Sequence, residues 1–250
     1  DFMKSWENTQ TQNDYLIKYN YKDKLNFTIS GKKDGFGAQY LAIMTGIAWC
    51  NFNNYNYVHT KLKSIEHNVN VELLNNFIGI PNTNLKSDIY VPYVYDVMYS
   101  DNPDKYYNEN TLNIIRDYYY LNEKNQINNK NCIVIHIRRG DIKPNNKKRG
   151  NTNEYYLNII KKLKNKNKNF KIIIESEGTK EDFRELLDLG IQFNLNKNID
   201  DTFHNLATAP ILVIAKSSLS YCAALLNKNI VYYIPHKLKN LKKWINVEKL

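Results

Sequence analysis

The sequence predicts an α/β protein built on parallel sheets in two lobes. Strand and helix patterns alternate through the second half of the 250-residue chain, and this alternation is typical of a parallel sheet with helices on both faces. The apolar run from Cys132 to Ile137 predicts a strand that is covered on both faces. A polar, asparagine-rich run at 122–131 predicts a linker, so we expect an N-terminal lobe at 1–125 and a C-terminal lobe at 126–250.

The first half has the weaker patterns. Leu25 to Ile29 alternates apolar and polar residues and predicts a strand, after which the glycine-rich loop Gly31 to Gly37 leads into an apolar helix from about Ala38 to Cys50. Gly31, Gly35 and Gly37 permit positive φ and a close approach of the backbone to a ligand, and a helix start offers N–H groups to an anion. The further elements that we expect are a strand at 55–59, a helix at 66–77, a strand at 90–97 and a helix at 106–121.

The second half is more regular. After the strand that ends at Ile137 we expect a basic loop at 143–151, and then helices and strands in alternation. The expected helices are 154–166, 179–189, 202–208 and one that ends at Leu226, and the expected strands are 170–174, 191–195, 211–215 and 230–234. Thr179 and Asp182 have the spacing of a helix N-terminal cap, and Gly190 is suited to end that helix. A closing helix is expected around Trp244.

Charged and hydroxyl side chains follow two of these strands. Arg138 and Arg139 come after the strand that begins at Cys132, and Lys216-Ser217-Ser218 comes after the strand at 211–215. Ligands bind at the carboxyl edge of parallel sheets, and guanidinium groups, hydroxyls and helix-start N–H groups all bind phosphate. The sequence therefore predicts a site for an anion such as a diphosphate. Two simpler interpretations stay open, namely ion pairs of the arginines with Asp141 or another carboxylate, and helix capping by the serines.

Charge and hydropathy limit the other functions. The formal net charge of +10 favours an anionic partner, which could be nucleic acid, a membrane surface or a nucleotide-linked small molecule. Lysine and asparagine are abundant almost everywhere, so part of this charge is expected on solvated surface. No apolar run reaches the length of a transmembrane helix, and the N-terminus has no signal-peptide core. We therefore expect no membrane span in this chain, and an upstream anchor stays open.

The three cysteines indicate a reducing environment. Cys50, Cys132 and Cys222 are far apart, lie in apolar surroundings and form no CxxC or Cys/His ligand spacing. Buried reduced thiols are the expected state. A cytoplasmic location, or another reducing compartment, fits this pattern.

The charged end of the central strand carries a family resemblance. His136-Ile137-Arg138-Arg139-Gly140-Asp141 resembles the HxRRGD signature of the fucosyltransferase superfamily, which includes the α1,2-, α1,6- and protein O-fucosyltransferases. Gly31 to Tyr40 is similar to the N-terminal glycine loop of that superfamily, which often reads GxGNQ, although Ala38 stands where asparagine is usual. The segments 200–209 and 215–227 resemble those before and after the last nucleotide-binding strand.

The resemblance implies a GT-B fold, with two Rossmann-like lobes of parallel sheet and a cleft between them. It also implies inverting, metal-independent transfer of a sugar from a nucleotide-diphosphate donor, with GDP-fucose as the default donor, no cofactor, and a hydroxyl of a glycan or glycoprotein as acceptor. By resemblance, the residues that bind the donor are Gly35, Gly37, His136, Arg138, Arg139, Ser217 and Ser218. Arg138 would bind the donor phosphate, and we expect Arg139 and Asp141 to pair as scaffold.

An inverting transfer also needs a base for the acceptor hydroxyl, and a carboxylate is the expected group. Asp34 in the glycine loop is our candidate, because some protein O-fucosyltransferases use an acidic residue in a similar loop. Asp141, Glu175 and Glu177 are rivals. Asp34 could equally shape a turn, which is a common role of aspartate.

Several alternatives remain at this point. The donor could be another nucleotide sugar such as a UDP-sugar, because fold similarity does not fix the substrate. The chain could bind a nucleotide sugar without turning it over. A basic nucleic-acid-binding protein is the alternative from another class, but the arginines lie at a sheet edge and the twenty tyrosines show no clustering with basic residues of the kind that binds RNA, so no nucleic-acid partner is expected. His204 and His236 are expected to be ordinary helix or loop histidines.

Overall fold

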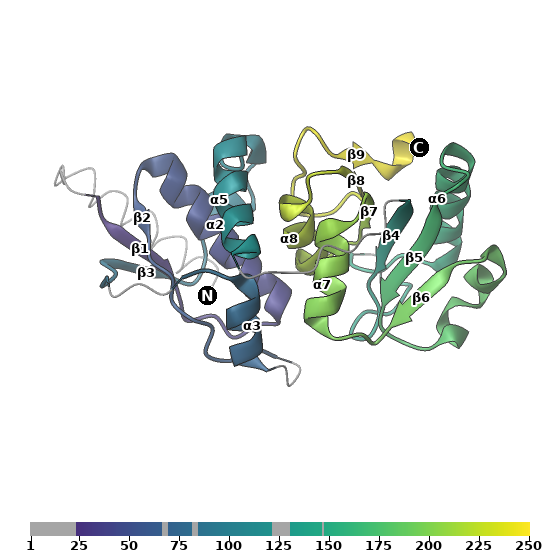
Figure 1. Ribbon diagram of the computed structural model, residues 1–250, viewed down its shortest axis with the longest axis horizontal. Coiled ribbons are helices and arrows are strands. Elements are labelled where there is room, and N and C mark those ends of the chain that lie inside the picture. The colour runs from purple at the N-terminus through teal and green to yellow at the C-terminus, as the bar shows by residue number, and fades with distance from the viewer. Residues whose placement is uncertain (1–23, 67–69, 82–84, 122–130, 147) are drawn as a thin grey trace. The chain divides into compact units, whose positions relative to one another are not determined.

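The computed structural model describes residues 24–66, 70–81, 85–121, 131–146 and 148–250 (Figure 1). The chain forms two compact units, Asp1–Lys124 and Asn125–Leu250, and each unit is an α/β structure with a parallel sheet. The predicted linker at 122–131 lies outside the described residues except for Asn131. The cleft expected between the lobes stays a prediction, because the structure defines each unit by itself.

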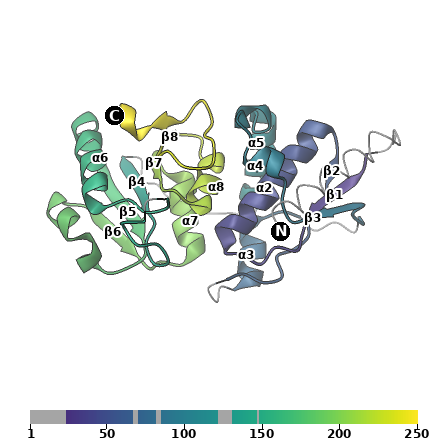
Figure 2. The same ribbon diagram turned by 180° about the vertical axis from the view of Figure 1, so that it is seen from behind.

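The C-terminal unit is a six-stranded parallel sheet with the order β6-β5-β4-β7-β8-β9, seen from behind in Figure 2. Its strands are β4 (Cys132–Ile137), β5 (Lys171–Ser176), β6 (Gln192–Leu195), β7 (Ile211–Ile214), β8 (Ile230–Tyr233) and β9 (Ile245–Asn246). The chain starts in the centre, moves outward to β6, returns to β7 and moves outward again to β9. The direction of winding therefore reverses between β4 and β7, and in a doubly wound sheet a ligand crevice forms at the carboxyl end of such a switch point.

Helices cover both faces of this sheet, as Figure 1 shows. They are α6 (Asn153–Lys166), the 3-10 helix η2 (Lys180–Leu189), α7 (Ile199–Thr208) and α8 (Ser218–Leu226). Ile133, Ile135 and Ile137 of β4 pack against Ile160 and Leu163 of α6, and all five side chains are fully buried. Helices α7 and α8 pack against each other on the opposite face, over β4 and β7. Both faces of this six-residue strand are covered, which explains why five of its six residues are apolar.

Two elements of the C-terminal unit differ from the expectation. The helix predicted around Trp244 is wrong: β9 occupies this segment, followed by one 3-10 turn, η3 (Val247–Lys249). Ile245 pairs with Tyr232 of β8, so the apolar residues here complete the sheet. The helix expected at 179–189 is a 3-10 helix interrupted at Phe183. Its predicted cap is present, because the Thr179 amide donates to the Asp182 carboxylate at 2.7 Å.

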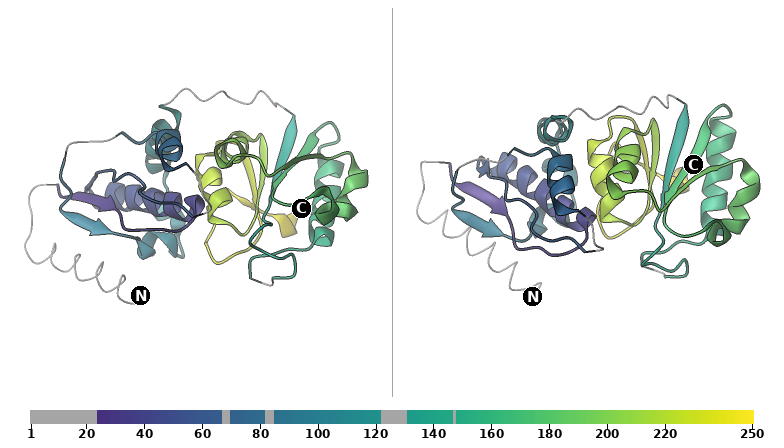
Figure 3. Two further views of the ribbon diagram at one scale, coloured as in Figure 1. Left: turned by 90° about the horizontal axis from the view of Figure 1, so that it is seen from below. Right: turned by 60° about the horizontal axis from the view of Figure 1, so that its bottom comes forward.

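The N-terminal unit has a three-stranded parallel sheet with the order β2-β1-β3. Figure 3 gives two further views of the ribbon. The elements are β1 (Asn26–Ile29), α2 (Phe36–Asn53), β2 (Asn56–Tyr57), α3 (Val71–Ile78), β3 (Ile89–Val91), α4 (Tyr95–Met98), the 3-10 turn η1 (Pro103–Lys105) and α5 (Glu109–Tyr120). Helix α2 is buried along most of its length. It packs against β1, β2, α4 and α5 and forms the centre of this unit's core.

The boundaries in this unit differ more from the expectation. The strand predicted at 90–97 ends at Val91, because the next residue is Pro92, which has no N–H to donate to a ladder. Residues 95–98 form helix α4 instead. Helix α3 begins only after Asn70, whose side chain accepts from the Leu73 amide at 3.0 Å, and α5 begins after Asn108, which caps it in the same way. Short polar caps therefore decide where these helices start.

No helix in the described part of the chain combines the length and the apolar character needed to cross a membrane.

Candidate functional site

The switch point of the C-terminal sheet brings the two predicted loops together. Ile135 of β4 is in register with Val213 of β7, so the residues three positions further on, Arg138 and Lys216, leave the sheet at the same level. The serines after Lys216 open helix α8. The two segments that the sequence singles out thus lie at neighbouring strand ends, on the edge where parallel sheets bind ligands.

Arg138 is oriented by Asp141. Its Nε donates to Oδ1 at 3.2 Å and its Nη2 donates to Oδ2 at 2.7 Å. Both side chains remain partly exposed, at 27% for Arg138 and 43% for Asp141. The expected pairing of Asp141 with Arg139 is therefore wrong, because Asp141 binds Arg138. The pair uses the Nε edge of the guanidinium, and Nη1 takes no part in it, so the group can still bind an anion end-on.

Arg139 lies in the interior. Only 6% of the residue is exposed. Its Nη1 donates to the Arg138 carbonyl at 3.1 Å, and its Nη2 donates to the Asn153 side-chain oxygen at 2.8 Å. Burial lowers the pKa of Arg139, while nearby groups including Asp182 raise it. These contacts assign Arg139 a structural role, which is one of the two roles that the sequence left open for it.

The two serines after β7, like the two arginines after β4, differ in burial and in hydrogen-bond partners. Ser217 is buried, and its hydroxyl accepts from the Leu219 amide at 3.2 Å. Its own amide donates to the Ala215 carbonyl at 2.8 Å. Ser217 is therefore the helix cap, as the simpler interpretation holds, whereas Ser218 is half-buried at the first position of α8. Ser218 and Lys216 are the better placed to meet a ligand.

His136 is buried in β4, with its Nδ1 lacking a hydrogen-bond partner among the described residues. Burial, assisted by the charge of Arg138, lowers the pKa of His136 to about 3. The imidazole is therefore neutral at pH 7. It lies in register with Glu175 of β5, so both side chains point to the face that α7 and α8 cover.

The rival carboxylates Glu175, in β5, and Glu177, which follows it, have different surroundings. Glu175 is fully buried, accepts from Asn194 at 2.6 Å and from Asn205 at 2.8 Å, and lines a small cavity of about 50 Å³. Burial raises its pKa. Glu177 lies against Gly140, whose φ is +77°, and a Cβ at Gly140 would overlap its carboxylate. The glycine of the arginine motif thus allows the two loops to approach.

Sequence reasoning missed a cluster of positive charge at this edge. The pKa of His236 is lowered to about 4, first by burial and then by the charges of Lys237, Lys216, Arg138 and Arg149. Arg149 belongs to the predicted basic loop, and the Asn146 side chain, which accepts from the amides of Lys148 and Arg149, shapes that loop. The order of strands could have indicated this cluster. His236 and Lys237 follow β8, which is parallel to β7, so they leave the sheet at the same edge as Lys216.

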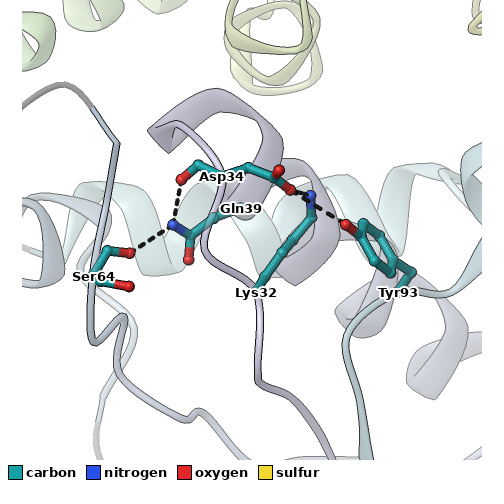
Figure 4. Close-up of polar contacts among 5 residues, drawn as sticks. All are labelled: Lys32, Asp34, Gln39, Ser64 and Tyr93. Carbon is teal, nitrogen blue, oxygen red and sulfur yellow. Dashed lines mark hydrogen bonds and ion pairs between the residues drawn. The ribbon is translucent and has the colours of Figure 1, made fainter. Parts of the chain in front are cut away.

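The N-terminal unit contains the candidate base (Figure 4). Asp34 forms an ion pair with Lys32 and accepts from the Tyr93 hydroxyl at 3.3 Å. Lys32 also lies 4.2 Å from the centre of the Tyr93 ring. The Lys32 side chain is 7% exposed and that of Asp34 is 46% exposed. The carboxylate is thus fixed from the protein side and open to solvent.

The loop around Asp34 is held by Gln39. Its Nε2 donates to the Asp34 carbonyl at 2.5 Å and to the Ser64 carbonyl at 2.8 Å, as Figure 4 shows. Of the three loop glycines, Gly31 has a positive φ of 85°, whereas Gly35 is the extended N-cap of α2. Helix α2 begins at Phe36, two residues earlier than predicted, so Gly37 lies in its first turn. The interactions with Lys32 and Tyr93 have no signal in the sequence, since Tyr93 lies far from Asp34 along the chain.

The cysteines and the possible metal ligands are the remaining reactive side chains. All three cysteines are unbonded and buried, as expected, and burial raises the pKa of each thiol. Within the described ranges, no three His, Cys, Asp or Glu side chains come together in a way that could hold a metal ion.

Comparison with known proteins gives fold neighbours only. No family model and no curated protein matches the chain. The solved structures that resemble it include the α-1,6-fucosyltransferase NodZ from Bradyrhizobium, co-crystallised with GDP, at 11% identity and a TM-score of 0.42, over 82% of this chain and 93% of that chain. The E. coli heptosyltransferase WaaC with ADP is similar at 12% identity and a TM-score of 0.38, over 90% of this chain and 66% of that chain. Likenesses of this size assign no activity, so the proposal below rests on the residues of the chain itself.

Proposed function

We propose that this protein is a glycosyltransferase of the GT-B fold that transfers a sugar from a nucleotide-diphosphate donor. The observation that carries the proposal is the position of Arg138 at the switch point of a doubly wound sheet, at the level of Lys216. Arg149 and Lys237 act on the same edge. A diphosphate fits such a group of cations, of which Asp141 orients Arg138, because each phosphate offers several acceptor oxygens.

The proposed reaction is inverting and needs no metal ion. The bond between the anomeric carbon and the diphosphate oxygen breaks, and the electron pair stays on the diphosphate, whose negative charge grows. Donors that are oriented before the reaction bind this growing charge more tightly than the ground state and so lower the barrier. The Asp141 carboxylate orients Arg138 for this role, while Ser218 adds a hydroxyl.

Asp34 is the proposed base. As the acceptor oxygen attacks the anomeric carbon, its proton passes to the Asp34 carboxylate, which Lys32 and Tyr93 hold in place. Aspartate is suited to this step because proton transfer to a positioned carboxylate speeds such reactions. Glu175 is a weaker candidate, because its carboxylate is fully buried and already accepts two side-chain hydrogen bonds.

GDP-fucose is the proposed donor, by the resemblance of the arginine motif, with a UDP-sugar as the alternative. The proposed acceptor is a hydroxyl of a glycan or glycoprotein. A nucleotide-sugar-binding protein without turnover is the second candidate function. The cations around Arg138 belong to one unit and can bind a nucleotide without Asp34, which belongs to the other unit. The cytoplasm or another reducing compartment is the proposed location, which the three free thiols support.

Thermal stabilisation tests the proposal. The wild type and Arg138→Ala are heated with GDP, UDP, ADP or a duplex oligonucleotide. Because a ligand that binds the folded state raises the melting temperature, we expect one nucleoside diphosphate to stabilise the wild type and to lose this effect in the variant. Lys161→Ala, on the exposed face of α6, is the matched control and should respond like the wild type. Stabilisation by the oligonucleotide alone, strongly dependent on salt, would reject the transferase.

A further inference from the structure

His236 lies at the carboxyl edge of the C-terminal sheet, where the donor diphosphate is proposed to bind, although the sequence gives it no role. Ile214 of β7 is in register with Tyr233 of β8. Lys216 comes two residues after Ile214 and His236 comes three residues after Tyr233, so both leave the sheet at the same edge. The His236 residue is half-buried. At this position the charge of Arg138, a residue of the proposed anion site, helps to lower the pKa of His236.

The tautomer of His236 follows from one contact. Its Nδ1 accepts a hydrogen bond from the Leu238 amide at 3.4 Å. Because neutral imidazole has one donor and one acceptor nitrogen, Nε2 carries the proton in this state. The ring can therefore donate a hydrogen bond through Nε2 while Nδ1 stays bound to its own loop.

The charges around His236 come from four segments. Lys237 is on its own loop, Lys216 follows β7, Arg138 follows β4, and Arg149 is in the loop that precedes α6. Two carboxylates share this edge: Asp141, which is paired with Arg138, and Glu177, which follows β5 and lies against Gly140. Burial and the four cations lower the pKa of His236 to about 4, so the unliganded protein holds a neutral imidazole among positive charges at pH 7.

A diphosphate would reverse this balance. An anion close to an imidazole favours the protonated form, and the same anion neutralises the surrounding cations. We propose that His236 is a further ligand of the diphosphate and takes up a proton from solvent when the diphosphate binds, to an extent that grows as the pH falls toward about 5.5. The inference rests on the proposed function, since it names a residue of the same donor site.

The proton that His236 takes up is not the proton that the acceptor hydroxyl loses in the reaction. The acceptor's proton goes to the base, whereas the proton on His236 arrives from water when the donor binds. After the glycosidic bond has broken, the nucleoside diphosphate carries one more negative charge than the donor did. The imidazolium is then positioned to stabilise that charge, and its proton returns to solvent when the nucleotide leaves.

Calorimetry measures this uptake directly. GDP-fucose and UDP-glucose are used as probes, because their diphosphates are diesters without a proton that titrates near neutral pH. Each is titrated into the wild type at pH 6 in two buffers with different ionisation enthalpies. If the ligand restores the pKa of His236 to its ordinary value of about 6.5, we expect uptake of roughly three-quarters of a proton, and an affinity that falls roughly tenfold between pH 5.5 and pH 7.5.

Two variants separate binding from titration. His236→Gln can still donate from an amide near the Nε2 position but does not titrate, so we expect near wild-type affinity at pH 7.5, no proton uptake and a flat pH profile. His236→Asn keeps an acceptor for the Leu238 amide and loses the donor, so it should bind severalfold more weakly. His204→Gln, which changes a half-buried histidine of α7 in the same unit, is the control and should show full uptake.

The outcomes distinguish the two proposals. Binding of a probe without proton uptake by the wild type, or with the same uptake in His236→Gln, overturns the inference about His236 and leaves the transferase standing. Failure of GDP, UDP and both diesters to bind the wild type overturns both. The wild-type measurements need no variant, so the test holds even if one of the substitutions prevents folding.

Discussion

Each unit of the molecule places an ion pair at its candidate site, and the two pairs differ in how far the cation reaches solvent. In the N-terminal unit the cation Lys32 is buried at 7% exposure, and its carboxylate partner Asp34 is 46% exposed. In the C-terminal unit the Arg138 side chain is 27% exposed and that of Asp141 is 43% exposed. The Asp141 carboxylate accepts hydrogen bonds from one edge of the guanidinium. The first pair thus presents only its carboxylate to solvent, whereas the second presents an oriented cation beside its carboxylate.

The difference teaches how similar pairs can serve different chemistry. A buried lysine under an exposed carboxylate holds an acceptor of protons in one geometry. A carboxylate along one edge of an arginine leaves the other donors of the guanidinium for a ligand. The Arg138–Asp141 pair is partly exposed, so it contributes little to stability and its substitutions should affect function more than folding. Removal of Asp34 would leave the buried Lys32 without its ion-pair partner, so the stability of an Asp34 variant is measured beside its rate.

The largest effect is expected from removing the charge of Asp34. Asp34→Asn keeps the shape and removes the base, so kcat should fall by roughly 10²- to 10⁴-fold while the dissociation constant of the nucleotide stays unchanged. Steady-state rates and calorimetry on the same samples measure the two quantities. Asp96→Asn, on the exposed side of α4, is the control. Unchanged turnover in Asp34→Asn would remove Asp34 as the base and direct attention to Glu177.

The next effect concerns the geometry of Arg138. Arg138→Lys keeps the charge but cannot make the two-point contact with Asp141, so kcat/KM should fall about 10- to 100-fold. The same substitution at Arg149, an exposed residue that acts on the site only as a charge, should change kcat/KM by less than about threefold. Equal losses at both positions would contradict an oriented guanidinium.

Acid should weaken the unliganded fold in both units. His59 in the N-terminal unit has its pKa lowered to about 4, and His136 and His236 in the C-terminal unit to about 3 and about 4. The unfolded chain, with histidine pKa values near 6.5, binds more protons between these limits, so the free energy of unfolding should decrease as the pH falls from about 6.5 to 4. Urea unfolding at pH 7 and pH 5 measures the change. The shift should be smaller in His236→Gln, and an unchanged shift would contradict the low pKa of this residue.

The smallest effect is expected at the glycine of the arginine motif. Gly140→Ala places a side chain at a φ of +77° and against Glu177, so the free energy of unfolding should drop by about 1–2 kcal/mol. Gly190→Ala is the matched control, because Gly190 has a φ of +60° and no atom near its Cβ position. The excess loss at Gly140 should disappear in the double variant with Glu177→Ala. If it persists, the contact with Glu177 is not its cause.

The C-terminal fold could be predicted because its signals are local. Strand β7 is a continuous apolar run and β4 is apolar except for His136, and Gly190 ends η2 with a positive φ. The N-terminal strands could not be predicted as well, since β2 and β3 contain two and three residues and have too few residues for a period. The apolar residues around Trp244 fit either a helix or an edge strand, and only the pairing of Ile245 with β8 decides between them.

The site was predictable at the level of segments. The arginines and serines lie at the ends of strands that the alternation of elements predicts to be parallel, so their common edge follows from topology. Which arginine meets solvent depends on the partner that folding supplies, and Asn153 binds Arg139 from the start of another helix. His236 was missed for a related reason, because its importance comes from charges on four separate segments.

The burial of Arg139 has a practical consequence for studies of this motif. Its guanidinium joins the Arg138 carbonyl to Asn153, which in turn donates to the Glu185 carboxylate at 2.7 Å. Removing Arg139 would take this donor from the partly buried Arg138 carbonyl and Asn153 oxygen, at a cost below the ~1–3 kcal/mol of a fully buried unsatisfied group. Loss of activity in an Arg139 variant would then reflect a low yield of folded protein, and the amount recovered from expression should be measured before such a variant is compared with Arg138.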